Sequence, residues 1–270
     1  MEGGLGADHA RPRMTLTRIP GPAGRLHVDD GGADDPPTVF VHSFASSSAH
    51  WSSPLAHLRP RRRAIALDLR GHGRSEAPLI EDYAIESLAK DIAAVVDRLG
   101  VERFSLVGHG LGAAAAIAYA GAHPRRVLRL LLVGAPGRVP ADQAREILTA
   151  LESDYDRVSR GYWEALLAGA RPHVRAQVVS ETGRLPRSAA LSLIRSTFRF
   201  DPLPALGAYR GPRLAVVTPH GDAPHDLHHL VPGLPHRLVR GTSHWVHMDD
   251  PEAFNAILDE FLGAGGPPMP

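Results

Sequence analysis

The sequence predicts an α/β fold in which a mostly parallel sheet carries helices on both faces and a block of further helices is inserted late in the chain. Short buried-strand patterns, such as residues 38–42 (TVFVH), alternate with amphipathic helical patterns, such as residues 85–99. From about residue 136 to 205 the strand patterns stop and helical patterns alone remain. Parallel strands need helical crossovers, so the alternation favours a parallel sheet, and the interruption is predicted to be a helical cap.

The first part of the chain is expected to start with a hairpin, because two strand-like runs flank a G-P-A-G turn at residues 21–24. Apolar residues recur with a period of 3.6 over residues 85–99, and Gly100 ends that helix. Small residues dominate the next predicted helix, 111–122. Before the insertion we therefore expect strands 15–19, 25–29, 38–42, 64–69, 104–107 and 127–133, and helices 51–58, 85–99 and 111–122.

Within the insertion, helical patterns cover residues 141–152, a stretch that passes through Tyr162 and Trp163 to Ala170, and residues 173–180 and 188–197. Strand patterns resume at 213–218 and 237–239, and an amphipathic helix over 251–262 follows them. We therefore expect a core made of residues 14–135 and 206–262 and a helical cap of residues 136–205. Residues 1–13 carry no periodic apolar pattern and are expected to be loose, and the tail 263–270 (GAGGPPMP) is expected to be flexible.

The composition excludes several classes of protein. The 270 residues include no cysteine, which rules out a disulfide framework, a Cys-ligated metal site and a thiol nucleophile. Thirty basic and 29 acidic residues give a formal net charge of +1, so no global field favours nucleic acid or an anionic membrane. No apolar run approaches the ~20 residues of a membrane span and no signal-peptide core is present, so we expect a cytoplasmic location.

Four turns that follow predicted strands carry residues typical of a catalytic site. They are Val41-His42-Ser43-Phe44, the glycine-rich turn 68–75 (DLRGHGRS), the sharp turn 107–112 (VGHGLG) and the turn 241–245 (GTSHW), which precedes the final helix. Each turn alone is a weak signal. Their order and spacing, with a helical insertion between the third and fourth, resemble the α/β-hydrolase fold family from about residue 15 to 262.

The resemblance implies roles for individual residues. In this family the nucleophile stands at the centre of a strained G-x-S-x-G turn, and the matching residue is Gly110 in G-H-G-L-G. The catalytic acid matches Asp222, with Asp226 as the competing candidate, and the base matches His244. The backbone N–H groups of Leu111 and Phe44 would form the oxyanion hole. No cofactor is needed by such a site.

Two residues depart from the family pattern. Gly110 has no side chain, so it cannot form an acyl-enzyme, although glycine suits a backbone that costs other residues ~1–3 kcal/mol. Loss of a triad serine costs about a millionfold in kcat. In the first turn, the family's usual His-Gly is replaced by His42-Ser43, which adds a hydroxyl near the site. We expect this turn, with serines 46–48, to face the oxyanion hole and not the base, which disfavours a relocated nucleophile.

Three functions are open at this point. The first is a capped serine esterase or lactonase for a small apolar ester or lactone, inactivated by Gly110 and retained as a substrate-binding form. The second is a non-hydrolytic enzyme, a lyase, isomerase or cyclase, in which His244 is a general base. The third is a non-catalytic ligand receptor. In each case the partner is a small molecule, with no nucleic acid or membrane, and the oligomeric state is open.

Aromatic residues of the predicted cap suggest an apolar pocket, and the residues expected to contact substrate are Ser43, His109, Trp163 and Trp245. Seven histidines crowd the last part of the chain, between His220 and His247. No H-E-x-x-H pattern accompanies them, so we interpret them as surface histidines and expect no metal site.

Overall fold

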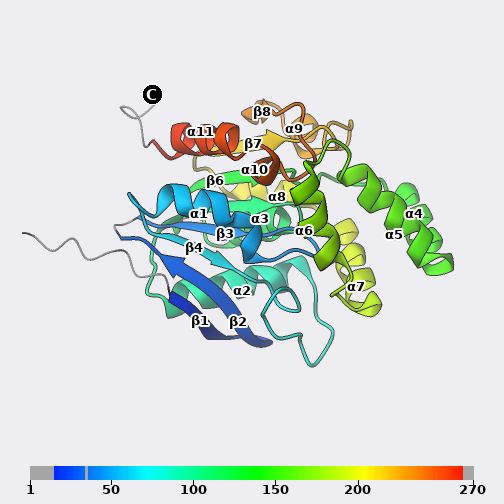
Figure 1. Cartoon of the computed structure of the whole chain (residues 1–270), viewed down its shortest axis with the longest axis horizontal. Helices are drawn as coiled ribbons and strands as arrows, with labels where there is room; N and C mark the ends of the chain where they lie inside the picture. Colours follow the sequence, from blue (N-terminus) through cyan, green and yellow to red (C-terminus); the bar gives the residue numbers. More distant parts are fainter. Residues whose placement is uncertain (1–14, 34–35, 264–270) are drawn as a thin grey trace, which may run out of the picture.

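Eight strands form one sheet in the computed structural model, which describes residues 15–33 and 36–263. Their order across the sheet is β1-β2-β4-β3-β5-β6-β7-β8 (Figure 1). The β1–β2 and β2–β4 pairs are antiparallel, and all the remaining pairs are parallel. The strands are β1 (Thr15–Gly21), β2 (Gly24–Gly31), β3 (Thr38–Val41), β4 (Ala64–Leu67), β5 (Phe104–His109), β6 (Val127–Val133), β7 (Arg213–Val217) and β8 (His236–Leu238).

Helices cover both faces of the sheet, which confirms the predicted fold class. The apolar side chains divide into two main clusters, one on each face. The first cluster includes Ile92 and Ile117, and the second includes Leu58 and Phe254. The helices of the first face are α2 (Ile85–Arg98), α3 (Leu111–Ala122) and α8 (Pro202–Ala208), and those of the second are α1 (Ser52–Leu58) and α11 (Pro251–Leu262).

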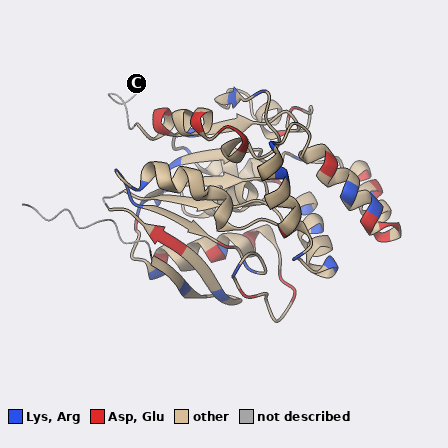
Figure 2. Ribbon diagram, in the orientation of Figure 1, with Lys and Arg blue, Asp and Glu red and all other residues tan. Residues whose placement is uncertain are grey.

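Four more helices lie between β6 and α8 and are called the helical insertion below. In Figure 1 they occupy the right-hand side, with α4 and α5 farthest from the sheet. Acidic and basic residues alternate along these two helices (Figure 2). A third apolar cluster, which includes Leu167, Val174 and Trp245, joins the insertion to the core. The four helices are α4 (Ala141–Ser153), α5 (Tyr155–Leu166), α6 (Pro172–Thr182) and α7 (Arg187–Arg199).

The structure contains three short helices that the sequence patterns did not predict: α8, α9 (Leu227–Leu230) and α10 (Val246–Asp249). Their lengths of seven, four and four residues are too short for a 3.6-residue period to be recognised. Strand β5 also runs two residues beyond its predicted end, because Gly108 and His109 pair with β6. Both extra residues lead directly into the turn at Gly110.

In the described part of the chain, we find no helix whose length and hydropathy would let it span a bilayer. The N-terminal segment 1–13 and the tail residues 264–270, expected to be loose and flexible, lie outside the described residues.

Candidate active site

The turn between β5 and α3 has the sharp geometry expected of a nucleophile elbow. Gly110 lies at its apex with φ 52° and ψ −115°, in a region that residues with a Cβ rarely adopt. A Cβ at Gly112 would lie 2.5 Å from the carbonyl oxygen of Val41, so helix α3 approaches strand β3 closely. A Cβ at Gly108 would lie 2.5 Å from the carbonyl oxygen of Gly112. Each of the three glycines of G-H-G-L-G therefore occupies a position where a side chain would collide with the backbone or would require an unfavourable backbone conformation.

His244 faces the apex of this turn. A Cβ placed on Gly110 would lie 3.3 Å from His244 Nε2, and one placed on Gly134 would lie 3.0 Å from Nδ1, so the ring lies between two glycines. Nδ1 is 3.4 Å from the hydroxyl of Thr218. Burial, with a smaller contribution from nearby His220, lowers the pKa of His244 to about 4. The ring is therefore neutral at pH 7 and able to accept a proton.

The backbone of His244 is held from both sides. Its N–H donates to the carbonyl of Leu166, at the end of α5, at 3.1 Å. Its carbonyl accepts a hydrogen bond from Nε2 of His109 at 3.0 Å. The first bond ties the histidine to the helical insertion and the second ties it to strand β5. The base is therefore positioned jointly by the insertion and the core.

Asp249 braces the same loop and was not identified from the sequence. Its Oδ2 accepts hydrogen bonds from the N–H of Ser243 at 2.8 Å and from the Ser243 hydroxyl at 2.5 Å. Its Oδ1 accepts from the N–H of Arg171, in the insertion, at 2.8 Å. The side chain is 1% exposed, so these donors replace water around a buried carboxylate. In the sequence it is one of two adjacent aspartates before a proline, a pattern that indicates only a helix start.

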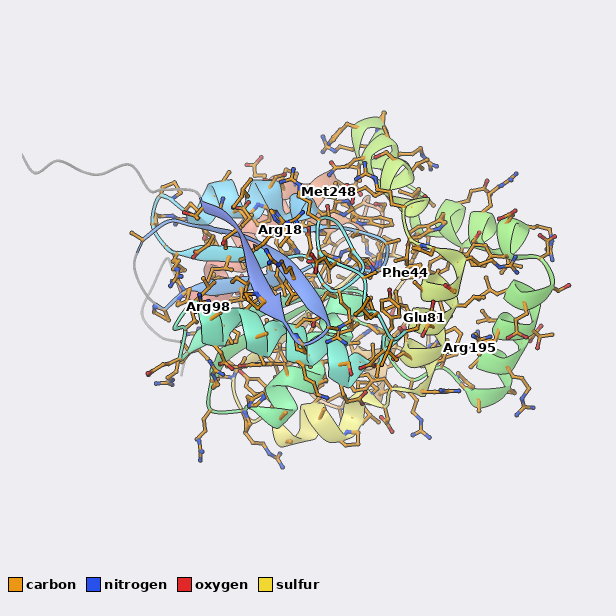
Figure 3. The ribbon with its side chains drawn as sticks, turned by 90° about the horizontal axis from the view of Figure 1, so that it is seen from below. Arg18, Phe44, Glu81, Arg98, Arg195 and Met248 are labelled. Carbon is orange, nitrogen blue, oxygen red and sulfur yellow. The ribbon has the colours of Figure 1, made fainter. Side chains whose placement is uncertain are left out.

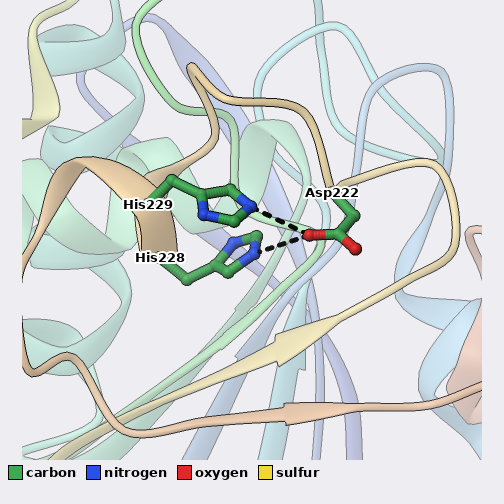
Figure 4. Close-up of side chains that lie close together, drawn as sticks. All are labelled: Asp222, His228 and His229. Carbon is green, nitrogen blue, oxygen red and sulfur yellow. Dashed lines mark hydrogen bonds and ion pairs between the residues drawn. The ribbon is translucent and has the colours of Figure 1, made fainter.

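The expected pairing of Asp222 with His244 is wrong. Asp222 is exposed, and its Oδ1 accepts hydrogen bonds from Nε2 of His228 at 3.1 Å and Nε2 of His229 at 2.9 Å (Figure 4). These bonds lower the pKa of the Asp222 carboxyl below its usual value. The loop after β7 turns the carboxylate toward α9, which the sequence patterns did not predict.

The competing acid, Asp226, does not reach the base either. Its Oδ2 accepts a hydrogen bond from the N–H of Ala223 at 2.6 Å and closes a local turn. Among the described residues, the ring of His244 has Thr218 as its hydrogen-bonding partner and contacts no carboxylate. In this structure the ring of His244 therefore lacks the carboxylate partner that the resemblance implied.

Asp222, His228 and His229 form the group of described residues that could hold a metal ion. One ligand atom from each lies within 4.8 Å of the others. Two imidazoles and a carboxylate are a donor set that suits zinc and similar divalent ions. The sequence interpretation treated these histidines as unconnected surface residues, because the approach of Asp222 depends on the course of the loop.

The first turn is rigid around Ser43. The ring of His42 donates from Nδ1 to the carbonyl of Ser43 at 2.7 Å and accepts at Nε2 from the N–H of Leu69 at 3.0 Å. Burial lowers the pKa of His42, which keeps the neutral tautomer that these two bonds require. Two residues later Ala45 has φ 48°, a left-handed conformation that is strained for a residue with a Cβ.

The side chain of Ser43 lies where the side chain of residue 110 would project. A Cβ built on Gly110 would overlap Ser43 Oγ and lie 3.1 Å from Ser43 Cβ. The same point is 3.3 Å from Nε2 of His244. The first turn, which we expected to face the oxyanion hole and not the base, therefore brings the Ser43 hydroxyl to the elbow at Gly110.

Two backbone N–H groups directly follow the residues at this point. Neither the N–H of Phe44 nor that of Leu111 has a hydrogen-bond acceptor among the described residues. Phe44 directly follows Ser43, and Leu111 directly follows Gly110. Backbone N–H groups without acceptors are the kind of donor that can stabilise an oxyanion.

The other residues expected to contact substrate divide into two groups. The ring of Trp163, in α5, stacks on that of Phe44 with 5.7 Å between their centroids. Phe44 is labelled in Figure 3, where it lies at the border between the core and the insertion. His109 and Trp245, also expected to contact substrate, are 0% and 1% exposed. The ring of His109 donates to the carbonyl of His244, and Trp245 belongs to the third apolar cluster.

Comparison with known proteins agrees with this architecture. The family model described as the alpha/beta hydrolase fold matches residues 36–163. The chain is 28% identical to the 2-(acetamidomethylene)succinate hydrolase of Mesorhizobium japonicum, over 98% of this chain and 99% of that protein. Among solved structures it is similar to Est816, an N-acyl homoserine lactone degrading enzyme, with TM-score 0.79 and 23% identity over 91% of this chain and 100% of the other.

A second solved structure is the enol-lactonase of Burkholderia xenovorans LB400, with TM-score 0.76 and 21% identity over 89% of this chain and 97% of the other. The chain has the α/β-hydrolase fold. Its named relatives include hydrolases, so the family resemblance is that of a hydrolase.

Proposed function

We propose that this site acts on a small apolar ester or lactone, as in a carboxylesterase or lactonase, and that residue 110 supplies no nucleophile. The observation that carries the proposal is the elbow at Gly110, whose missing Cβ would lie 3.3 Å from Nε2 of His244. The N–H groups of Phe44 and Leu111, which follow the two residues at that point, have no acceptor among the described residues. A nearby imidazole and two free N–H donors on adjoining turns support acyl transfer at this position.

The geometry supports a division of labour at the bound carbonyl. Its oxygen would accept hydrogen bonds from the N–H groups of Phe44 and Leu111, and neutral His244 would accept a proton at Nε2. Gly110 has no hydroxyl to attack the carbonyl carbon. If residue 110 alone is taken into account, the chain is an inactivated form that binds substrate. Its kcat is then about a millionfold lower than that of the same site with a serine at position 110.

Aromatic side chains support an apolar substrate. Trp163 stacks on Phe44, and Phe44 follows the turn that carries Ser43. A substrate carbonyl bound at the Phe44 N–H would place its acyl or alcohol portion near these rings. Two structural neighbours, the N-acyl homoserine lactone degrading enzyme and the enol-lactonase, carry names that denote action on lactones.

A second candidate function uses His244 as a general base without a covalent step. No carboxylate among the described residues is hydrogen-bonded to its ring, which favours this candidate over an ordinary triad. The base would then deprotonate a substrate C–H or O–H group, or a water molecule, directly. Such an enzyme would lose its activity in His244→Gln and keep it in variants that lack the Ser43 hydroxyl.

The test restores a serine at the elbow. Because a side chain at 110 would overlap Ser43 Oγ, Gly110→Ser is made together with Ser43→Gly and assayed against p-nitrophenyl esters and alkyl-substituted lactones. The proposal predicts hydrolysis that disappears when His244→Gln is added. Val179→Ala, at an exposed position of α6, is the matched control in the same background. Absence of ester and lactone hydrolysis in the folded double variant would contradict the proposed function.

A further inference from the structure

We propose that Ser43 is the nucleophile of this site, with His244 as its base. The inference rests on the proposed function and adds to it: the hydroxyl missing from the elbow is supplied by the neighbouring turn. Its starting point is the overlap between Ser43 Oγ and the Cβ that residue 110 lacks. The two positions differ from the family pattern in opposite directions, since one has lost a side chain and the other has gained a hydroxyl.

The hydroxyl of Ser43 is not engaged elsewhere. Among the described residues it forms no hydrogen bond, either with His244, whose ring pairs with Thr218, or with another group, and the residue is 5% exposed. Nε2 of His244 lies 3.3 Å from the point that Ser43 Oγ overlaps. With the imidazole proton on Nδ1, directed at the Thr218 hydroxyl, Nε2 carries the lone pair that a general base needs.

The first turn also holds the serine in place as an elbow would. His42 fixes the Ser43 carbonyl, and Ala45 has the left-handed φ of 48°. Strained backbone conformations of this kind persist where the surroundings enforce them, and they gather at catalytic sites. The positive φ that the family places at the third turn therefore occurs at both turns of this chain, at Gly110 without strain and at Ala45 with it.

The oxyanion donors suit either nucleophile. In a G-x-S-x-G elbow the N–H after the nucleophile and an N–H of the first turn stabilise the oxyanion. With Ser43 as the nucleophile, the N–H after it is that of Phe44, and the second donor is that of Leu111. The two turns exchange roles while the same pair of N–H groups is kept.

The reaction balances with these groups alone. Ser43 Oγ attacks the carbonyl carbon of the ester as His244 Nε2 takes the hydroxyl proton. The bond to the alcohol oxygen then breaks, and that oxygen takes the proton from His244, which leaves an acyl group on Ser43. Water gives a proton to Nε2 and attacks the acyl carbon, and the acid leaves as Ser43 regains its proton. Without a carboxylate on His244, kcat is expected to be about 10⁴-fold below that of a full triad.

The first test is covalent labelling by a fluorophosphonate, followed by peptide mass spectrometry. The proposal predicts an adduct on Ser43 that is lost in Ser43→Ala and in His244→Gln. Ser46→Ala, in the same turn, is the matched control and should be labelled like the parent protein. Unchanged labelling of Ser43→Ala, or an adduct elsewhere, would overturn the proposal. If the parent protein gives no adduct while Ser43→Gly/Gly110→Ser is labelled at residue 110, the proposed function stands and the Ser43 proposal fails.

A second test measures the reactivity of a thiol placed at position 43 and does not require catalytic turnover. Because the chain has no cysteine, Ser43→Cys introduces a single thiol whose alkylation by iodoacetamide can be followed alone. A thiol beside His244 Nε2 should react at pH 7 about tenfold faster than that of Ser46→Cys, and adding His244→Gln should remove the difference. Equal rates for the two single-cysteine proteins, with both folded by circular dichroism, would overturn the proposal.

Discussion

Ser43 Oγ fills the space that a side chain at Gly110 would need, so these two residues cannot both carry a side chain in the observed arrangement. The elbow that positions a nucleophile in the α/β-hydrolase fold is thus kept as backbone, while a hydroxyl reaches the same point from the first turn. This relationship determines how the site should respond to substitution.

The first prediction concerns the stability of elbow variants. Gly110→Ser alone places a Cβ against Ser43 and forces a residue with a side chain to φ 52°, so the free energy of unfolding should fall by about 2–4 kcal/mol. Adding Ser43→Gly removes the overlap and should recover at least half of that loss. Urea unfolding of the two single variants and the double variant measures the coupling, and strictly additive effects would contradict the overlap.

Asp222→Asn should change kcat/KM by no more than about twofold, because the carboxylate bonds to His228 and His229 and not to His244. A true triad acid costs about 10⁴-fold in kcat when removed. Steady-state assays on the most active ester or lactone distinguish these outcomes. A loss of several thousandfold in a folded Asp222→Asn protein would show that the loop carries Asp222 to His244 during catalysis.

Asp249→Asn should lower kcat, because the carboxylate receives three hydrogen bonds that hold the loop before His244. In asparagine an NH₂ group replaces one carboxylate oxygen and would face a donor, either Arg171 or Ser243, instead of accepting from it. We therefore also expect the free energy of unfolding to fall by about 1–3 kcal/mol. Asp250→Asn is the matched control: its side chain caps α11 through the N–H of Ala253, so that change should leave kcat unaltered. Equal kinetics for the two variants would rule out a positioning role for Asp249.

The pH dependence of stability should report the buried histidines. The pKa values of His244 and His72 are lowered to about 4 and about 3 by burial, and burial also lowers that of His247. The unfolded chain binds protons at these residues below pH ~6.5, where the folded chain does not. Stability should therefore fall as the pH drops from about 6.5 toward 4, and thermal unfolding across that range measures the proton uptake.

His247→Phe tests this account at one site. The ring of His247 stacks on Trp51 with centroids 4.2 Å apart, and neither nitrogen has a hydrogen-bond partner among the described residues. Phenylalanine keeps the shape and removes one titrating group, so unfolding below pH 6.5 should take up about one proton fewer. Val179→Ala, at an exposed position of α6 without a titrating group, is the control that should leave the slope unchanged. An unaltered slope for His247→Phe would count against this account.

The sequence predicted the helices, strands and turns that are determined by residues close together in the chain. Helices α3 and α11 and strand β6 begin and end at the predicted residues. A run of small residues defines α3, an amphipathic pattern that starts at Pro251 defines α11, and a nearly continuous apolar run defines β6. The elbow glycines and His244 were identified for a similar reason, since a tight turn needs glycine wherever a Cβ would collide.

Contacts between residues of different turns could not be predicted from the sequence. The direction of Ser43 follows from the backbone of its turn, including the positive φ of Ala45, a residue that gives no such signal. Asp222 turns toward α9, a helix too short to predict, and Asp249 gains its role through an N–H of the insertion. Each of these contacts joins segments far apart in the chain or depends on one loop conformation.

The measurement that tests the central claim most directly is identification of the residue that becomes acylated. The protein without substitutions is mixed with an activated aryl ester, and the reaction is stopped rapidly with acid. Peptide mapping by mass spectrometry locates the added acyl group. The account predicts an acyl adduct on Ser43 that forms only when His244 is present. An unmodified Ser43 under conditions of measurable ester hydrolysis would contradict it.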